Sequence, residues 1–193
     1  NKTGADPETL KILNEEIFID KNAAYFQGKK IKGSDPATFK VITNKEKINI
    51  YSSDKNNVYI YNRKIKGADP VTFEVLDVPY SKDKNSVYFF FFFVYGADIG
   101  TFEILDENYS KDKDHVYNFD DRLNGIDSAT FEILGNLYTK DKNNVYYNNG
   151  RIFGADVRSF VFITGTEYAK DRDNIYYFGK KLPKVDVGSF EVL

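Results

Sequence analysis

The sequence contains no cysteine, no methionine, no tryptophan and a single histidine, His115. Without cysteine the chain can form no disulfide, thiolate nucleophile or thiolate metal site. A common nucleophilic triad would have to use His115 as its base. His115 occupies a position that Asn57, Asn144 or Ser86 fills in matching segments. We therefore interpret it as a surface turn residue and not as a general base.

Long hydrophobic runs and an excess of one charge are also missing. The longest apolar stretch, residues 87–95, is about half of what a membrane-spanning helix needs. The 27 basic and 29 acidic residues give a net charge of −2 with no basic run, so we expect no nucleic-acid binding. Because the chain begins with Asn1 inside a repeat and lacks methionine, we expect it to be a piece of a longer protein.

What the sequence does contain is a repeat made of two landmarks. The first is an Asp-Lys-Asn-type turn followed by Val/Ile-Tyr, and the second is a Gly-Ala-Asp-Pro-x-Thr-Phe element, fullest at residues 67–76. The Asp of each turn lies 15 residues before the Asp of the next Gly-Ala-Asp element, as Asp54 lies before Asp69. The return stretch varies between 14 and 19 residues, so it holds the solvated loops. The turns begin at Asp20, Asp54, Asp83, Asp112, Asp141 and Asp171.

Self-similarity at about 29 residues is typical of repeat arrays in which each unit packs on its neighbours. We predict one all-β domain, residues 1–193, built as an open array of about six β-hairpin repeats with short helical or 3-10 corners. A closed, propeller-like barrel of small blades is the alternative, and it is disfavoured because common blades need roughly 40 to 50 residues. The expected units are 4–32, 33–66, 67–95, 96–124, 125–153 and 154–183, with a partial copy at 184–193.

One repeat shows how the strands are expected. Residues 72–75 alternate apolar and polar side chains as a half-buried strand does, and residues 80–82 and 87–89 form the next two strands. Residues 83–86 read as a turn because Asp and Asn bond their own backbone. At the corner, Asp69 is placed as an N-cap before Pro70, and Gly67 supplies a positive φ.

The strings Asp-Lys-Asn-Asn-Val-Tyr at residues 54–59 and Asp-Lys-Asn-Asn-Val-Tyr-Tyr at residues 141–147 resemble the repeats of the bacterial DKNYY family. Residues 171–177 resemble them too, and the resemblance extends over essentially the whole chain. It implies a bacterial, often exported protein, and it carries over no activity and no site residues. The second Tyr of the family string is replaced by Phe26, Ile60, Phe89 and Asn118 in four copies.

Two recurrent features allow a structural and a chemical interpretation. The first Tyr of each repeat is expected in the core with its hydroxyl on a backbone group, and a ladder of rings that stacks sugars is the alternative. The Asp-x-Asp strings at residues 112–114 and 171–173 hold calcium-type oxygen ligands, but we interpret them as plain turns and predict no metal or other cofactor. The recurrent tyrosines are Tyr25, Tyr59, Tyr88, Tyr117, Tyr146 and Tyr176.

One segment breaks the pattern. Five consecutive phenylalanines cannot all point inward from a strand whose faces alternate. Three of them, at residues 91–93, align with Asn149, Gly150 and Arg151, where another repeat turns in solvent. Either the segment covers a neighbouring repeat or it is an exposed interaction site for a partner, another copy or a membrane surface. The candidate interaction residues are Phe89, Phe90, Phe91, Phe92 and Phe93.

These observations favour a non-enzymatic, exported scaffold that binds other proteins, because repeat arrays offer extended binding surfaces. A cell-surface carbohydrate-binding module is the alternative, and an enzyme such as a glycosidase is a distant third, since an active site is normally a single constellation while these carboxylates recur. Partners are an unidentified protein or a cell-surface glycan, with self-association through the phenylalanine run as a further possibility. The expected location is extracellular, periplasmic or on the surface of a bacterium.

Overall fold

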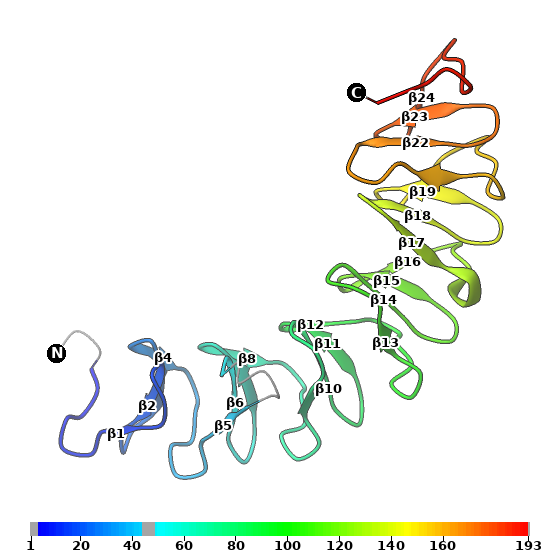
Figure 1. Ribbon diagram of the computed structural model, residues 1–193. Coiled ribbons are helices and arrows are strands. Elements are labelled where there is room, and N and C mark those ends of the chain that lie inside the picture. The colour runs from blue at the N-terminus through cyan, green and yellow to red at the C-terminus, as the bar shows by residue number, and fades with distance from the viewer. Residues whose placement is uncertain (1–3, 44–48, 193) are drawn as a thin grey trace. The chain divides into compact units, whose positions relative to one another are not determined.

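The structure is a computed structural model that describes residues 4–43 and 49–192. Within these residues, six four-stranded antiparallel sheets follow one another along the chain, and no sheet closes into a barrel (Figure 1). The strands of each sheet lie in chain order, because short turns can join antiparallel neighbours. The predicted all-β array of hairpin repeats is therefore confirmed, and the closed propeller-like barrel is not what the chain forms.

Each sheet lies within one of the expected repeat units. The first contains β1 (Lys11–Ile12), β2 (Ile17–Ile19), β3 (Ala24–Phe26) and β4 (Lys29–Ile31). The second contains β5 (Lys40–Ile42), β6 (Tyr51–Ser53), β7 (Val58–Ile60) and β8 (Arg63–Ile65). The third contains β9 (Glu74–Val75), β10 (Tyr80–Lys82), β11 (Val87–Phe89) and β12 (Phe92–Phe93).

The other three sheets repeat this order. The fourth contains β13 (Glu103–Ile104), β14 (Tyr109–Lys111), β15 (Val116–Asn118) and β16 (Asp121–Leu123). The fifth contains β17 (Glu132–Gly135), β18 (Tyr138–Lys140), β19 (Val145–Tyr147) and β20 (Gly150–Arg151). The sixth contains β21 (Val161–Phe162), β22 (Tyr168–Lys170), β23 (Ile175–Tyr177) and β24 (Lys180–Lys181).

The chain divides into two compact units. One unit is Asn1–Gly100 with Phe119–Asp121, and the other is Thr101–Asn118 with Arg122–Leu193. Residues 119–121 are the tip of a hairpin, and they belong to the first unit because Phe119 packs on Phe89 there, with ring centroids 5.3 Å apart. Across residues 4–43 and 49–192, no helix has the length and hydrophobicity that a membrane span requires.

The corners differ in part from the prediction. Gly67 has a φ of +80°, as expected for the entry to a corner. Only one corner in the described residues forms a 3-10 helix, η1 (Ser128–Thr130), whose N-cap Asp127 accepts a hydrogen bond from the Thr130 N–H. At the Asp69 corner the carboxylate accepts instead from the Val71 N–H at 2.8 Å, two residues on, which gives an Asx turn without a helix.

A second set of buried tyrosines joins the second, third and fourth repeats to the repeat that follows, and the sequence analysis did not single it out. The Tyr51 hydroxyl donates to the Pro79 carbonyl of the following sheet at 3.2 Å. The Tyr80 hydroxyl donates to the Phe119 carbonyl at 3.2 Å, and the Tyr109 hydroxyl donates to Asn149 Oδ1 at 2.9 Å. These bonds satisfy a polar group that is buried between repeats, where an unpaired hydroxyl would be costly.

Candidate functional site

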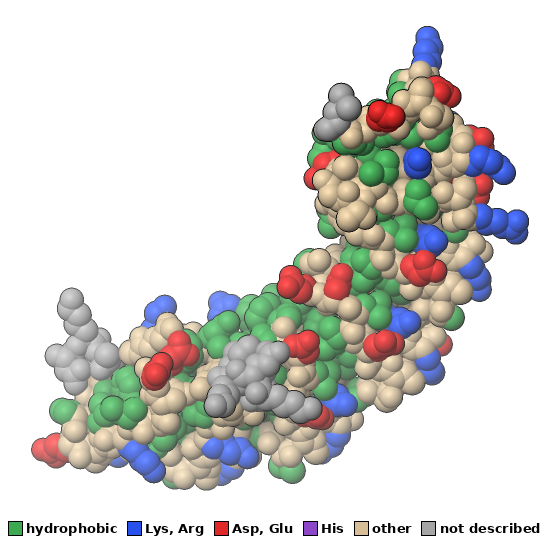
Figure 2. Space-filling model, in the orientation of Figure 1, with side chains coloured by type: hydrophobic (Ala, Val, Ile, Leu, Met, Phe, Trp, Pro, Cys, Tyr) green, Lys and Arg blue, Asp and Glu red, His purple; other side chains and the backbone are tan. Residues whose placement is uncertain are grey.

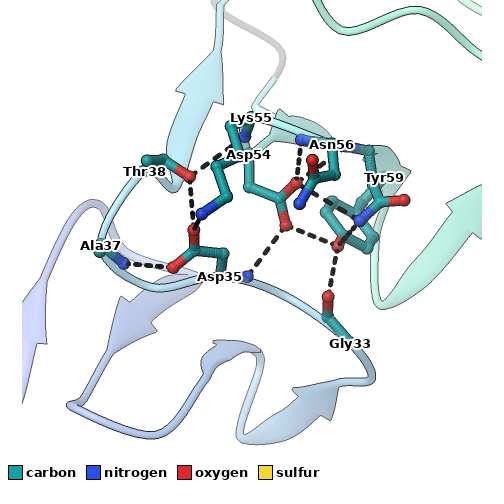
Figure 3. A network of polar contacts seen from close by, with 9 residues as sticks. Gly33, Asp35, Ala37, Thr38, Asp54, Lys55, Asn56 and Tyr59 are labelled. Carbon is teal, nitrogen blue, oxygen red and sulfur yellow. Dashed lines mark hydrogen bonds and ion pairs between the residues drawn. The ribbon is translucent and has the colours of Figure 1, made fainter.

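The recurrent Asp-Tyr pair is the polar centre of every repeat, and Figure 3 shows it around Asp54. Asp54 is buried, and its Oδ1 accepts from the Asn56 and Asn57 N–H groups at 2.8 Å each. Its Oδ2 accepts from the Tyr59 hydroxyl at 2.8 Å and from the Asp35 N–H at 2.9 Å. These donors hold one carboxylate, and they fix the turn, the following strand and the preceding corner together.

The sequence analysis placed the hydroxyl of the recurrent tyrosines on a backbone group, and this partner was wrong in most copies. In each repeat the hydroxyl donates to the carboxylate of the turn Asp five residues earlier. Among the six tyrosines, Tyr59 alone also donates to a backbone acceptor, the Gly33 carbonyl, at 3.1 Å. All six rings are buried, so none offers a face for stacking a sugar. The hydroxyl-to-carboxylate distances are 3.1 Å at Tyr25, 2.8 Å at Tyr59, Tyr88 and Tyr117, 3.0 Å at Tyr146 and 2.6 Å at Tyr176.

The hydrogen bonds lower the pKa of Asp20, Asp54 and Asp171, and burial raises the pKa of the six recurrent tyrosines. Burial raises the pKa of the Asp20 carboxyl, but backbone donors and the Tyr25 hydroxyl outweigh it and lower that pKa from 3.8 to about 2. Burial, and then the hydrogen bond to ionised Asp54, raise the pKa of Tyr59 well above its usual value. A carboxylate that already accepts several donors has little capacity left for a metal or a substrate. The arrangement is that of a structural clamp.

Around this clamp the charged side chains form regular ion pairs. Lys55 Nζ lies 3.0 Å from Asp35 Oδ2, so the turn lysine neutralises the corner aspartate (Figure 3). Figure 2 shows basic and acidic side chains interspersed on the face in view, with hydrophobic side chains between them. The same turn-to-corner pairing occurs at Lys21–Asp6, Lys84–Asp69, Lys142–Asp127 and Arg172–Asp156, and cross-strand pairs join Lys82–Glu74, Lys111–Glu103 and Lys140–Glu132.

The two calcium-type strings and the histidine lie in these turns. Asp112 Oδ1 accepts from the Asp114 and His115 N–H groups at 2.8 and 2.7 Å, and Asp114 lies 3.0 Å from Lys113 Nζ. His115 is half-buried in the turn, with its Nδ1 3.6 Å from Asp112 Oδ1. In the part of the chain that the structure describes, no three acidic or histidine side chains are grouped so that they could hold a metal ion.

The phenylalanine run divides into a packed half and an exposed half. Phe90 and Phe91 form the tip of the hairpin β11–β12 and pack against the buried core that contains Tyr51, Val58 and Ile60. Phe92 and Phe93 form β12 and remain 50% and 43% exposed. The register matches the alignment made from sequence, since Phe92 lies opposite Phe89 as Gly150 lies opposite Tyr147.

Beside β12 lies an open groove of about 550 Å³ that the sequence analysis missed. The guanidinium carbon of Arg63 lies 5.1 Å from the centre of the Phe91 ring, which is a cation–π contact. The signal was present in the sequence, because Lys-Lys-Ile-Lys-Gly at residues 29–33 and Arg-Lys-Ile-Lys-Gly at residues 63–67 are both free of acidic residues. We call this the aromatic-basic groove, and its charged and aromatic lining is Lys32, Arg63, Lys64, Lys66, Phe91 and Phe92.

Comparison with known proteins supports the repeat interpretation. The model of the DKNYY family matches residues 1–121 and, in a second overlapping copy, residues 93–193. No curated protein and no solved structure matches the chain. Since the two matches together extend from the first residue to the last, the chain belongs to the DKNYY family.

Proposed function

We propose that the chain is a non-enzymatic repeat module that binds another protein through β12 and the aromatic-basic groove. The observation that carries this proposal is the exposure of Phe92 and Phe93, at 50% and 43%, on an edge strand. Two neighbouring large apolar side chains gain nothing from water, so a surface that covers them is favoured. The expected bacterial origin and export of the protein stay predictions.

The edge strands support the proposal through their composition. An edge strand has unpaired backbone N–H and C=O groups that attract other chains, and charged side chains normally protect it. Among the twelve described strands at the edges of the sheets, β12 and β21 are the two without a charged residue. Its counterparts β4, β8, β16, β20 and β24 each carry at least one Lys, Arg or Asp. The protection is therefore missing where the aromatic side chains are exposed.

The lining of the groove also resembles the centre of a protein interface more than a sugar site. Aromatic side chains and arginine dominate the binding energy of protein interfaces. Arg63 and Phe91 already stack on each other, which lowers the entropy lost on binding. The glycan alternative loses its main support because the recurrent tyrosines are buried.

A double substitution tests the proposal. Phe92→Gly with Phe93→Arg installs the residues of β20 on β12, and Val71→Arg adds a charge at a position that is 87% exposed and outside the groove. We expect the double variant to keep the melting temperature of the parent while it loses self-association in light scattering and retention of envelope proteins. Val71→Arg should change neither. A double variant with lower stability and unchanged association would show instead that β12 is a lid on its own repeat.

A further inference from the structure

We propose that the aromatic-basic groove binds an acidic, extended peptide segment of the partner, with apolar residues between its carboxylates. This inference rests on the proposed function and names the chemistry of its partner. Six cations lie on the first and second sheets or directly after them. Each of β4 and β8 carries two, and one more follows each strand in the same register: Lys29, Lys30 and Lys32, and Arg63, Lys64 and Lys66.

These six cations lack the ion pairs that many other basic side chains form, and they share this lack with others among the described residues, such as Lys11, Lys40 and Lys180. Eight other basic side chains in the turns and on the strands pair with a corner Asp or a cross-strand Glu. In the described residues, none of the six has a carboxylate within ion-pair distance, and all six residues are exposed. Lys32, Arg63, Lys64 and Lys66 line one groove, where their like charges repel each other, so an anionic partner that neutralises them is favoured.

The groove adds an apolar surface to this charge. Lys32, Lys64 and Lys66 line it together with Phe91 and Phe92, so cations and aromatic rings contact the same space. A ligand that fits must therefore carry carboxylates or other anions with apolar groups between them. An extended peptide of alternating acidic and apolar residues has this pattern, because its side chains point alternately to opposite sides.

Other anionic polymers fit the groove less well. Asn62 is the one uncharged polar side chain in the described lining, whereas a sugar needs several such groups to bond its hydroxyls. A phosphate polymer would use the cations but would leave Phe91 and Phe92 uncovered. The volume of about 550 Å³ lies within the usual range for a binding site, which suits a few residues of a peptide.

Fluorescence anisotropy with a labelled peptide Glu-Val-Glu-Phe-Glu-Val-Glu tests the inference. We expect the matched peptide with Gln in place of Glu to bind at least about tenfold more weakly, and a rise in salt to about 0.5 M to weaken the acidic peptide similarly. Lys64→Glu with Lys66→Glu should abolish binding. The matched control is Lys180→Glu with Lys181→Glu, which makes the same charge change on the edge strand β24, outside the groove. This control should still bind the acidic peptide.

The possible failures are distinguishable. Equal binding of the Glu and Gln peptides would overturn the acidic partner while leaving the protein-binding function of β12 intact. Tighter binding of polygalacturonate or inorganic polyphosphate than of the peptide, lost in the Lys64/Lys66 variant, would also overturn it and assign the groove to a different polymer. If the parent protein does not bind the acidic peptide but the Phe92/Phe93 variant loses envelope-protein retention, the acidic-peptide inference fails and the protein-binding function of β12 survives.

Discussion

The hairpins β11–β12 and β19–β20 have the same register and different tips. In both, a buried tyrosine donates to the turn aspartate, Tyr88 to Asp83 and Tyr146 to Asp141. One tip is Phe90-Phe91 followed by an exposed apolar strand, and the other is Asn148-Asn149 followed by Gly150-Arg151. The clamp tolerates both because it lies at the opposite end of the hairpin. The repeat thus separates residues that hold the fold from residues that are free to acquire a partner.

The largest predicted effect tests whether the two clamps are equivalent. Tyr88→Ala and Tyr146→Ala each remove a buried ring, so each should lower the free energy of unfolding by about 3 kcal/mol. Each also leaves a buried carboxylate with one donor fewer, which adds to the loss. Urea unfolding of the two variants measures this. An effect at Tyr88 that is much smaller than the effect at Tyr146 would mean that the phenylalanine tip replaces the clamp.

The second prediction concerns acid, and it is made for the clamps of Asp20, Asp54 and Asp171. The pKa of Asp20 is lowered in the folded state to about 2 from 3.8, and the pKa values of Asp54 and Asp171 are lowered too. A lowered folded-state pKa contributes stability that is present above about pH 4 and is lost as the pH falls through about 2. Urea unfolding between pH 6 and 2 should show this decline, and Asp20→Asn should make it shallower. An unchanged slope in Asp20→Asn would contradict the assignment.

The sequence predicted the strands, the turns and the positive φ at Gly67 because each depends on residues close together in the chain. It did not predict the acceptor of the recurrent tyrosines, since strand periodicity says which face is buried but not which buried group accepts a hydroxyl. It also missed the aromatic-basic groove. Arg63 and Phe91 belong to neighbouring repeats, and only the packing of one sheet beside the next brings the guanidinium over the ring.

A smaller effect is expected at two matched glycines. Gly67 and Gly154 have φ values of +80° and +77°, so an Ala at either should cost about 1 kcal/mol in unfolding free energy. An added Cβ at Gly154 meets nothing within 4 Å, whereas at Gly67 it lies 3.3 Å from Cζ of the Phe93 ring. Because that ring is partly exposed and can move, we expect Gly67→Ala to cost only slightly more than Gly154→Ala. A much larger difference would show that Phe93 is held rigidly against its own chain, which favours the lid.

The smallest effect is expected from the ion pairs that both repeats share. Lys84 Nζ lies 2.5 Å from Asp69 Oδ2, and Lys142 Nζ lies 2.6 Å from Asp127 Oδ2, with both lysines mostly exposed. Water and salt screen such pairs, so Lys84→Ala and Lys142→Ala should each lower the melting temperature by no more than about 2 °C at low salt. The difference from the parent should shrink near 1 M salt, because the screening length falls there to about 3 Å. Lys64→Ala, which breaks no ion pair, should not lower the melting temperature at any salt concentration. A lower melting temperature would mean that Lys64 stabilises its own repeat, and it would contradict the proposal that the cations beside β12 bind an anionic partner.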